Sequence, residues 1–247
     1  MSITIVSTDL TRLDWDLPDC PVNLREFRFR RLTRADLPAV KELHDALFPV
    51  KYSDAFYEEL LNEFHINILA FAPVCKMRSG GSATEDAVEL VGIATATWEP
   101  VTGIGGCRRW HEGYISTLGV AEGYRQIGLG TFLVRSIVRL LIQFKRVRVV
   151  HLHVLVRAPQ LCLSAGPEAT ITPLQVSNEP ALRMYAKCGF VRTQYLPDHY
   201  HFGGRHHDAY LLTRTCTRDE ISALSRVGTG ATDQAKDAGW SALCVIL

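Results

Sequence analysis

A turn at residues 121–131 carries the clearest chemical pattern in the sequence. Arg125, Gly128 and Gly130 follow a hydrophobic segment, residues 114–120, and precede a segment with helical periodicity. Glycines in the first turn of a helix lower its stability, so their presence indicates that something must approach the bare backbone. The unpaired N–H groups and positive dipole end of a helix N-terminus suit a phosphate. We therefore interpret this turn as a cradle for a pyrophosphate.

Two common phosphate-binding loops do not fit this turn. A dinucleotide-binding loop requires a third glycine, but Leu133 stands at that position. A Walker loop requires a lysine after the last glycine, whereas Gly130 is followed directly by Thr131. The pattern Arg-x-x-Gly-x-Gly after a strand therefore remains, with an ordinary strand–turn–helix unit as the alternative interpretation.

Two histidines in the segment 147–156 are the main candidates for proton transfer. His151 and His153 are two residues apart, so they would lie on the same face of a strand. Histidine titrates near neutral pH, and a tyrosine such as Tyr114 can position a water by donating and accepting hydrogen bonds. A core histidine satisfied by the backbone is the alternative for His153. A metal pair is conceivable, but no third ligand stands at a diagnostic spacing, and we predict no metal.

The composition is that of an ordinary globular protein. Of the 247 residues, 47% are hydrophobic and 21% charged, and the formal net charge of +1 gives no general attraction to nucleic acid. Seven cysteines without a Cys-x-x-Cys pair favour a reducing compartment. We recognise no secretory signal and no apolar run long enough to span a bilayer, so we expect a cytoplasmic protein.

The elements that would position the chemical residues alternate between helices and strands. We expect a strand at 27–31, helices after Thr33 and from Ser53 to about residue 64, and paired strands at 66–74 and 90–98. After the central turn we expect a helix at 131–145, a buried strand at 147–156, a helix at 178–187, and strands at 190–195 and 208–215. The His-rich residues 197–207 would connect the last two strands. One α/β domain would cover 25–216, with insertions at about 76–88 and 157–175, an arm at 1–24 and a flexible tail at 217–247.

In this order, the motifs resemble the GNAT acetyltransferases over about residues 25–215. The Arg125 turn resembles their motif A, which holds the pyrophosphate of acetyl-CoA, and Asn178-Glu-x-Ala-x-x-x-Tyr185 with Gly189-Phe190 resembles their motif B. The local matches are closest to N-terminal acetyltransferases of the NatE and NatF types. These matches are Phe48-Pro49-Val50-x-Tyr52, Tyr114-Ile-x-Thr-Leu-Gly, His151-Leu-His153-Val, and Tyr195-Leu-Pro followed by Tyr200. The resemblance implies the GNAT fold, a mixed, mostly antiparallel sheet that splays between its fourth and fifth strands and is flanked by helices.

The resemblance also implies roles for individual residues. Tyr114 and His153 would hold a water that takes the proton from the substrate amine, and Tyr185 would protonate the leaving thiolate. The backbone N–H near Val120, where the strand of the family bulges, would polarise the thioester. The residues implied for acetyl-CoA are Leu118, Gly119, Val120, Arg125, Gln126, Ile127, Gly128, Leu129, Gly130, Thr131, Asn178 and Tyr185. Those implied for the peptide are Phe48, Pro49, Val50, Tyr52, Tyr114, Ser116, His199 and Tyr200.

An apolar, aromatic groove of this kind accepts Met followed by a hydrophobic residue in the family. Here the segment Asp198-His199-Tyr200 is less aromatic than the matching segment of the family, which could favour a different second residue. Three functions compete: an N-terminal acetyltransferase, a GNAT enzyme acting on lysine side chains or a small amine, and a non-catalytic acyl-CoA-binding module. The intact motif residues count against the last. We expect no nucleic-acid partner, and this branch of the family suggests a monomer.

The final residues, Cys244-Val245-Ile246-Leu247, form a Cys-a-a-X box of the form that favours geranylgeranyl. A chance ending is the alternative. One prenyl chain anchors weakly, and no tight basic cluster precedes Cys244. We therefore expect a reversible tether to the cytosolic face of a membrane.

Overall fold

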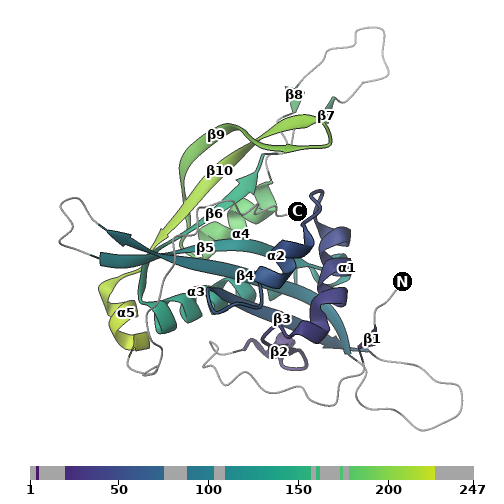
Figure 1. Cartoon of the computed structure of the whole chain (residues 1–247), viewed down its shortest axis with the longest axis horizontal. Coiled ribbons are helices and arrows are strands. Elements are labelled where there is room, and N and C mark those ends of the chain that lie inside the picture. The colour runs from purple at the N-terminus through teal and green to yellow at the C-terminus, as the bar shows by residue number, and fades with distance from the viewer. Residues whose placement is uncertain are drawn as a thin grey trace, which may run out of the picture.

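The computed structural model describes residues 4–5, 20–74, 88–102, 109–156, 160–161, 173–174 and 178–225. An eight-stranded sheet forms its centre, with strand order β2-β3-β4-β5-β6-β10-β9 and β1 beside β4 (Figure 1). The strands are β1 (Thr4–Ile5), β2 (Arg28–Arg30), β3 (His65–Pro73), β4 (Val88–Thr102), β5 (Arg109–Val120), β6 (Val147–Leu155), β9 (Val191–Phe202) and β10 (Arg205–Thr215). Two short strands, β7 (Gln160–Leu161) and β8 (Pro173–Leu174), pair with each other.

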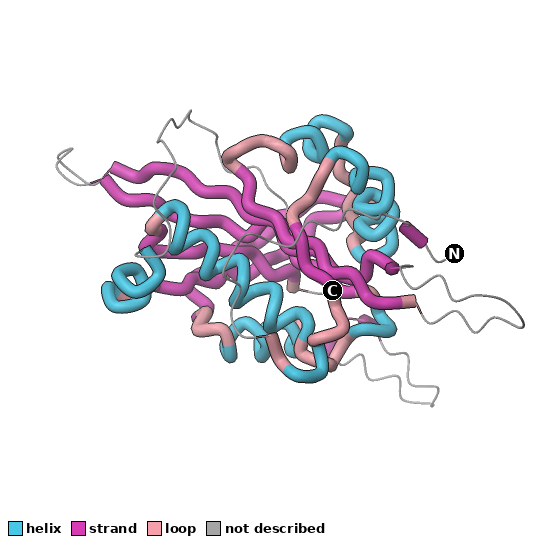
Figure 2. Tube along the Cα trace, turned by 90° about the horizontal axis from the view of Figure 1, so that it is seen from below, coloured by secondary structure: helices cyan, strands magenta, loops and turns pink. Residues whose placement is uncertain are grey.

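Helices cover both faces of the sheet, as Figure 2 shows. One layer consists of α1 (Leu37–Leu47) and α2 (Asp54–Glu59), and the other of α3 (Leu129–Lys145), α4 (Glu179–Lys187) and α5 (Arg218–Ser225). Short 3-10 helices, η1 (Val22–Leu24), η2 (Arg34–Asp36) and η3 (Glu122–Tyr124), lie in the connections. The apolar residues of α3 and α1 enter two separate buried clusters, because each helix has one apolar stripe to bury.

The sheet opens between β5 and β6, which are the only parallel neighbours among the described strands. They pair from His111 with Val147 to Tyr114 with His151, and no further. β5 then continues to Val120 along β4, while β6 continues to Leu155 along β10. The pairing confirms the prediction of a mixed, mostly antiparallel sheet that splays between these two strands.

The helix starts follow the capping residues in the sequence. Thr33 and Asp36 form a reciprocal capping box at the start of η2, and Ser53 Oγ accepts the backbone N–H of Phe56 at 3.3 Å. The second helix ends at Glu59, earlier than expected. One reason is that the side-chain amide of Asn67, on β3, donates a hydrogen bond of 2.8 Å to the carbonyl of Leu60.

The prediction of a His-rich connection at 197–207 is wrong. β9 and β10 run through this segment as one long hairpin, and only Gly203 and Gly204 lie between them. Both glycines have positive φ, 59° and 69°, which a tight hairpin turn requires. A Gly-Gly pair between two strands is a hairpin signal, so the signal was present in the sequence.

The prediction of a flexible tail beginning at residue 217 is wrong for its first part, because 218–225 form α5. Thr217 Oγ1 accepts the backbone N–H of Glu220 at 3.2 Å, and Glu220 accepts the backbone N–H of Thr217 at 2.9 Å. This is again a capping box. Arg214 on β10 also bonds Glu220, which fixes the helix to the sheet. Cys244, and most of the two predicted insertions, lie outside the described residues.

Candidate active site

A tyrosine–histidine pair lies where β5 and β6 begin to separate. The hydroxyl of Tyr114 on β5 is 2.7 Å from Nδ1 of His153 on β6. Tyr114 is buried, with an exposed fraction of 1%, while His153 is half-buried. Parallel pairing of the two strands places residues 39 apart in the sequence within hydrogen-bonding distance. The structure therefore brings together the two residues for which we predicted proton transfer.

The surroundings of His153 disfavour its charged form. Burial, followed by the neighbouring His199 and His151, lowers the pKa of His153 to about 4. The rings of His153 and His199 lie 4.3 Å apart between centroids, in a tilted arrangement. His153 is therefore neutral at pH 7, and it can accept a hydrogen bond and hand on a proton without first losing one.

The irregularity of β5 lies at Ser116 rather than near Val120. Opposite β4, Thr117 pairs with Thr95 and Ile115 with Ala96, so that Ser116 is the extra residue of a β-bulge. Val120 itself pairs regularly with Gly92. Our placement of the bulge near Val120 is therefore wrong. The side chain of Ser116 is buried, and its hydroxyl has no hydrogen-bond partner among the described residues.

The turn from β5 into α3 has the shape of an open cradle. Gly128 is the N-cap of α3 with φ of 90°, and residues 125–128 are exposed. The Arg125 side chain donates to the carbonyl of Val120 at 3.0 Å. Asn23, from η1, donates to the carbonyl of Ile127 at 2.6 Å and so ties the N-terminal part of the domain to the cradle. The first N–H groups of the 17-residue helix α3 point out of this turn and suit a phosphate.

Close packing explains the second glycine of the motif. A Cβ atom on Gly130 would stand 3.0 Å from the sulfur of Met184 on α4. α3 therefore approaches α4 closely at the residue where the cradle begins. Asn178 is buried just before α4, and Tyr185 is fully buried and packs against Phe190 at 5.7 Å between ring centroids. The roles predicted for Asn178 and Tyr185 stay predictions.

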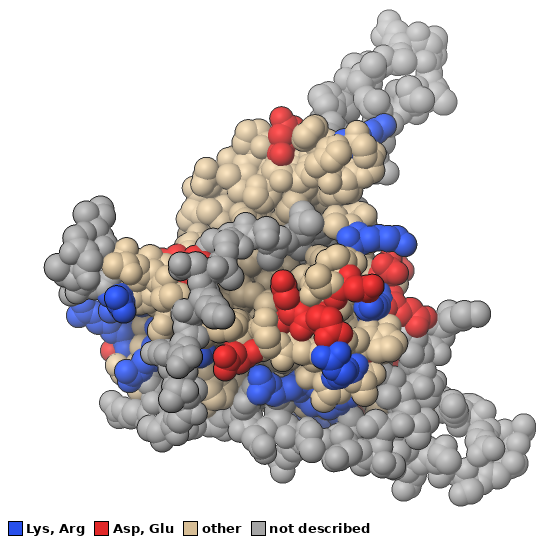
Figure 3. Space-filling model, in the orientation of Figure 1, with Lys and Arg blue, Asp and Glu red and all other residues tan. Residues whose placement is uncertain are grey.

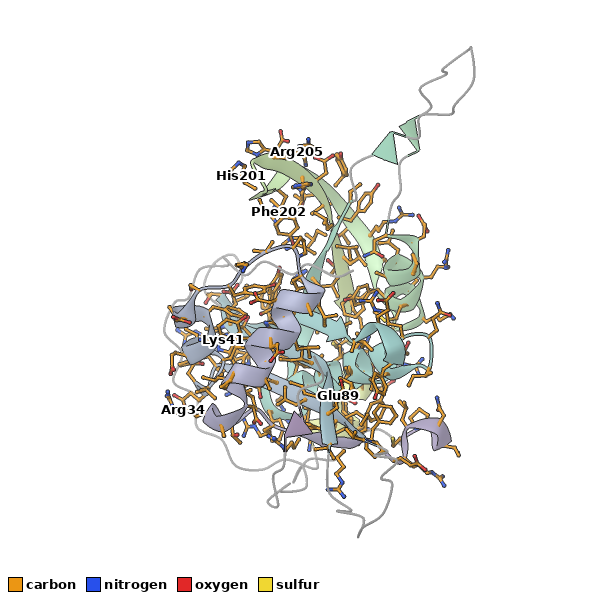
Figure 4. All side chains as sticks on the ribbon, turned by 90° about the vertical axis from the view of Figure 1, so that its right-hand side faces the viewer. Arg34, Lys41, Glu89, His201, Phe202 and Arg205 are labelled. Carbon is orange, nitrogen blue, oxygen red and sulfur yellow. The ribbon has the colours of Figure 1, made fainter. Side chains whose placement is uncertain are left out.

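The residues predicted to line the peptide groove come together on the face of the sheet that carries α1. Phe48 and Tyr200 are buried in one apolar cluster, with Val50, Tyr52 and Phe202 packed at its edge. Tyr200 and Phe202 reach this cluster from the long hairpin, whose tip carries Phe202 in Figure 4. Pro49 and His199 are exposed. The hairpin surface shown in Figure 3 is largely uncharged, whereas acidic and basic side chains gather over α1 and α2.

We predicted no role for His44 from the sequence, but its ring packs against Phe48 and Tyr52, two of the predicted groove residues. His44 is fully buried on α1, and four aromatic rings surround it, those of Phe48, Tyr52, Phe56 and Tyr57, at 5.1–6.4 Å between centroids. Neither ring nitrogen has a hydrogen-bond partner among the described residues, and burial lowers its pKa to about 3. The signal was its position, four residues after Val40 and three before Leu47, on the apolar stripe of the helix.

Comparison with known proteins agrees with the fold. The family model described as "Acetyltransferase (GNAT) family" matches residues 37–161, half of the chain. The chain belongs to the GNAT acetyltransferase family, and it is an acyltransferase that uses acetyl-CoA as co-substrate. Among the described residues, no group of three or more His, Cys, Asp or Glu side chains could hold a metal ion.

Particular relatives carry more specific names. The histone acetyltransferase MCC1 of Arabidopsis thaliana is 24% identical over 81% of this chain and 74% of its own length. The N-alpha-acetyltransferase 60 of Drosophila melanogaster is also 24% identical, over 83% of this chain and 74% of its own length. The crystal structure of Arabidopsis thaliana NAA60 with a bisubstrate analogue superimposes with a TM-score of 0.58, at 25% identity, over 77% of this chain and 99% of that one.

In the described part of this chain, no helix is long and apolar enough to cross a membrane.

Proposed function

We propose that this protein is an N-alpha-acetyltransferase that transfers the acetyl group of acetyl-CoA directly to the free α-amine of peptides beginning with Met and a hydrophobic residue. The observation that carries this proposal is the Tyr114–His153 pair, 2.7 Å apart at the opening of the sheet, where the ring of His153 packs on His199 and that of His199 on Tyr200. The relative named N-alpha-acetyltransferase 60 supports an α-amine as the acceptor.

The proton chemistry favours an α-amine over a lysine side chain. An unperturbed α-amine has a pKa near ~8, so a useful fraction is neutral at pH 7, whereas an unperturbed lysine has one near ~10.4. The difference corresponds to about 3 kcal/mol of extra deprotonation free energy. A histidine whose pKa is about 4 is a weak base for this task. The amine proton becomes acidic as the nitrogen bonds to the acetyl carbon, so a water held by His153 and Tyr114 can relay it away at that stage.

In the proposed transfer, the amine nitrogen forms a bond to the acetyl carbon and the carbon–sulfur bond breaks. The water held by Tyr114 and His153 takes the amine proton, and Tyr185 would return a proton to the thiolate. Acetyl-CoA supplies the activated acyl group. Its pyrophosphate would lie on the N–H groups of Gly128, Gly130 and their neighbours, in the exposed cradle at the start of α3.

The groove supports an apolar first residue in the substrate. Phe48, Tyr52 and Tyr200 contribute rings to one apolar cluster. A hydrophobic N-terminal segment would bury apolar area there, worth about 25 cal/mol per Å². A polyamine, by contrast, would require several carboxylates in the groove.

One observation favours a second candidate, acetylation of lysine side chains. It is the relative named as a histone acetyltransferase, which is as similar to this chain as the N-terminal acetyltransferase is.

A prenyl tether at Cys244 also stays a prediction, because this residue lies outside the described residues.

The test is a panel of acceptors with release of free CoA as the readout. The panel contains Met-Leu, Met-Lys, serine-start and acidic-start peptides, an N-blocked lysine peptide, and spermidine, with the Tyr114→Phe and His153→Ala variants alongside. We expect activity on the free Met-Leu peptide that both variants lose. Activity restricted to the blocked lysine peptide or to spermidine would overturn the proposed acceptor. Binding of CoA without any turnover would instead support a non-catalytic module.

A further inference from the structure

A second side-chain pair repeats the geometry of the Tyr114–His153 pair one step along the same two strands. Glu112 precedes Tyr114 by two residues on β5, and His151 precedes His153 by two residues on β6. Oε2 of Glu112 lies 3.1 Å from Nε2 of His151. Both pairs join residues 39 apart in the sequence, and residues two apart on a strand share a face. The two pairs therefore form successive rungs on one face of the sheet.

Further hydrogen bonds hold the second rung at both ends. The indole N–H of Trp110 donates to Oε1 of Glu112 at 2.8 Å, so both carboxylate oxygens are bonded. Nδ1 of His151 lies 3.1 Å from Oγ1 of Thr213 on β10. That hydroxyl in turn lies 2.9 Å from Oγ1 of Thr193 on β9. Four strands contribute to this arrangement, so its geometry is set by the sheet itself.

Only one of the four side chains in the two rungs is buried. That residue is Tyr114, whereas His153 is half-buried and the side chains of His151 and Glu112 are 21% and 22% exposed. The titratable groups around the second rung are Glu112 from β5, His153 from β6 and, facing His153, His199 from β9. Thr213 and Thr193 add neutral hydroxyls from β10 and β9.

We propose that His151 takes the proton from the Tyr114–His153 pair and releases it to solvent, and that Glu112 positions His151 for this role. This inference rests on the proposed function, because it concerns the amine proton of that reaction. The proton that leaves the attacking nitrogen first reaches the water at Tyr114 and His153. It then passes through water, over the ~7 Å that separates alternate residues of a strand, to the hydroxyl of Thr213, which gives its own proton to Nδ1 of His151. Thr213 changes from donor to acceptor at that nitrogen, while Nε2–H keeps its bond to Glu112. The partly exposed imidazolium finally gives a proton to solvent water.

The experiment measures single-turnover acetyl transfer to the Met-Leu peptide at pH 7 and fixed ionic strength, at increasing concentrations of imidazole buffer. The His151→Gln variant keeps groups that can bond to Glu112 and Thr213 but cannot carry a proton. We expect its rate in a dilute, non-transferring buffer to fall about tenfold, less than the 10²–10⁴-fold typical of a residue that acts on the substrate directly. Imidazole should restore most of the loss, because it can take the proton in place of His151. The wild-type rate should not depend on imidazole.

Two further variants separate this role from a purely structural one. Glu112→Gln keeps an acceptor for Trp110 but removes the charge, so it should show the same rescue even if His151→Gln folds poorly. His111→Gln is the matched control, because His111 lies on the other face of β5 and bonds the carbonyl of Lys145 at 2.7 Å. Its rate should not respond to imidazole.

The outcomes distinguish this inference from the proposed function. An active wild type with a His151→Gln rate that falls equally at every imidazole concentration would overturn the inference and leave the acceptor proposal intact. If only another amine is acetylated, the acceptor proposal fails, and the same rescue series with that amine decides the role of the second rung. A wild type that acetylates nothing would overturn both.

Discussion

The two halves of the candidate site are built from different kinds of atoms. On the α3 side, the cradle consists of backbone: the positive φ of Gly128, the exposed turn before it and the first N–H groups of the helix. On the α1 side, the predicted groove and the Tyr114–His153 pair consist of side chains from β5, β6, β9 and α1. A backbone site depends on which residues lack a side chain, and a side-chain site depends on the register of strands distant in sequence. Substitutions in the two halves should therefore change different kinetic constants.

The largest effect should come from the side-chain half. In Tyr114→Phe and His153→Ala, kcat for the Met-Leu peptide should fall by roughly 10²–10⁴-fold, which is the rate enhancement that general acid–base groups usually contribute. The KM for acetyl-CoA should stay unchanged, because the cradle is intact. Steady-state kinetics with each substrate varied in turn checks this split. A rise in the KM for acetyl-CoA as large as the fall in kcat would contradict the division into two halves.

The pH dependence of the same reaction sharpens this prediction. His153 has a pKa of about 4 and is neutral throughout the range above pH 6. The decline of kcat/KM below pH 8 should then follow protonation of the substrate amine, whose pKa in free peptides is near ~8. A profile that bends at the same pH for a peptide and for an amine of lower pKa would show that an enzyme group controls it instead.

The next effect should come from the backbone half. Gly128→Ala places a Cβ on a residue with φ of 90°, and although no atom lies within 4 Å of that Cβ, the conformation costs about 1–2 kcal/mol. We expect the KM for acetyl-CoA to rise about tenfold, with little change in the KM for the peptide. Gly123→Ala is the matched control, since a Cβ there also meets nothing and no positive φ is required. Equal effects of the two substitutions would contradict a role for the backbone conformation of Gly128.

The buried His44 should show its effect in stability rather than in catalysis. Its pKa is about 3 in the folded protein and near ~6.5 in the unfolded chain, so the unfolded chain takes up the proton first as the pH falls. Folding then loses about 1.4 kcal/mol per pH unit between pH 6.5 and 3. Replacing the ring by a similar apolar volume, His44→Leu, should remove this loss, worth about 2 kcal/mol at pH 5.

Urea unfolding at pH 7 and pH 5 measures the difference between His44→Leu and the wild type. We expect this difference to grow in favour of the variant as the pH falls. Some acid sensitivity should remain in the variant, because burial also lowers the pKa of His65 to about 4. A difference that is the same at both pH values would mean that His44 can be protonated in the folded protein.

The smallest effect should come from the hairpin turn that carries Tyr200 and His199 to the groove. Asn tolerates positive φ and loses less conformational entropy than glycine, so Gly203→Asn should change the free energy of unfolding by less than about 1 kcal/mol. Acetyl transfer should be unaffected. Gly203→Val, which cannot adopt a φ of 59° without strain, should lower both stability and activity. Thermal unfolding with a parallel activity assay compares the pair.

Much of the fold could be predicted because its signals are local. The capping residues Thr33 and Ser53 begin their helices as expected, and the β-branched run after residue 147 forms a strand. This strand is fully buried on one face only, since Val150, Leu152 and Val154 are buried while the residues between them are half-buried. Two errors came from local signals that were present but not weighed, the Gly-Gly turn at 203–204 and the capping box at Thr217. The site of the β-bulge at Ser116 could not be predicted in this way, since a bulge is defined only against the partner strand.

The sequence by itself determined the glycine turn between β5 and α3, because glycine spacing, a helix start and a preceding strand are all properties of one continuous segment. It also determined which side chains were available for chemistry. Only the tertiary structure decided that Tyr114 meets His153, that Glu112 meets His151, and that four aromatic rings enclose His44. Those contacts depend on strand register and on the packing of elements far apart in the chain. No local pattern encodes them, because each is fixed by the burial of the whole sheet between its two layers of helices.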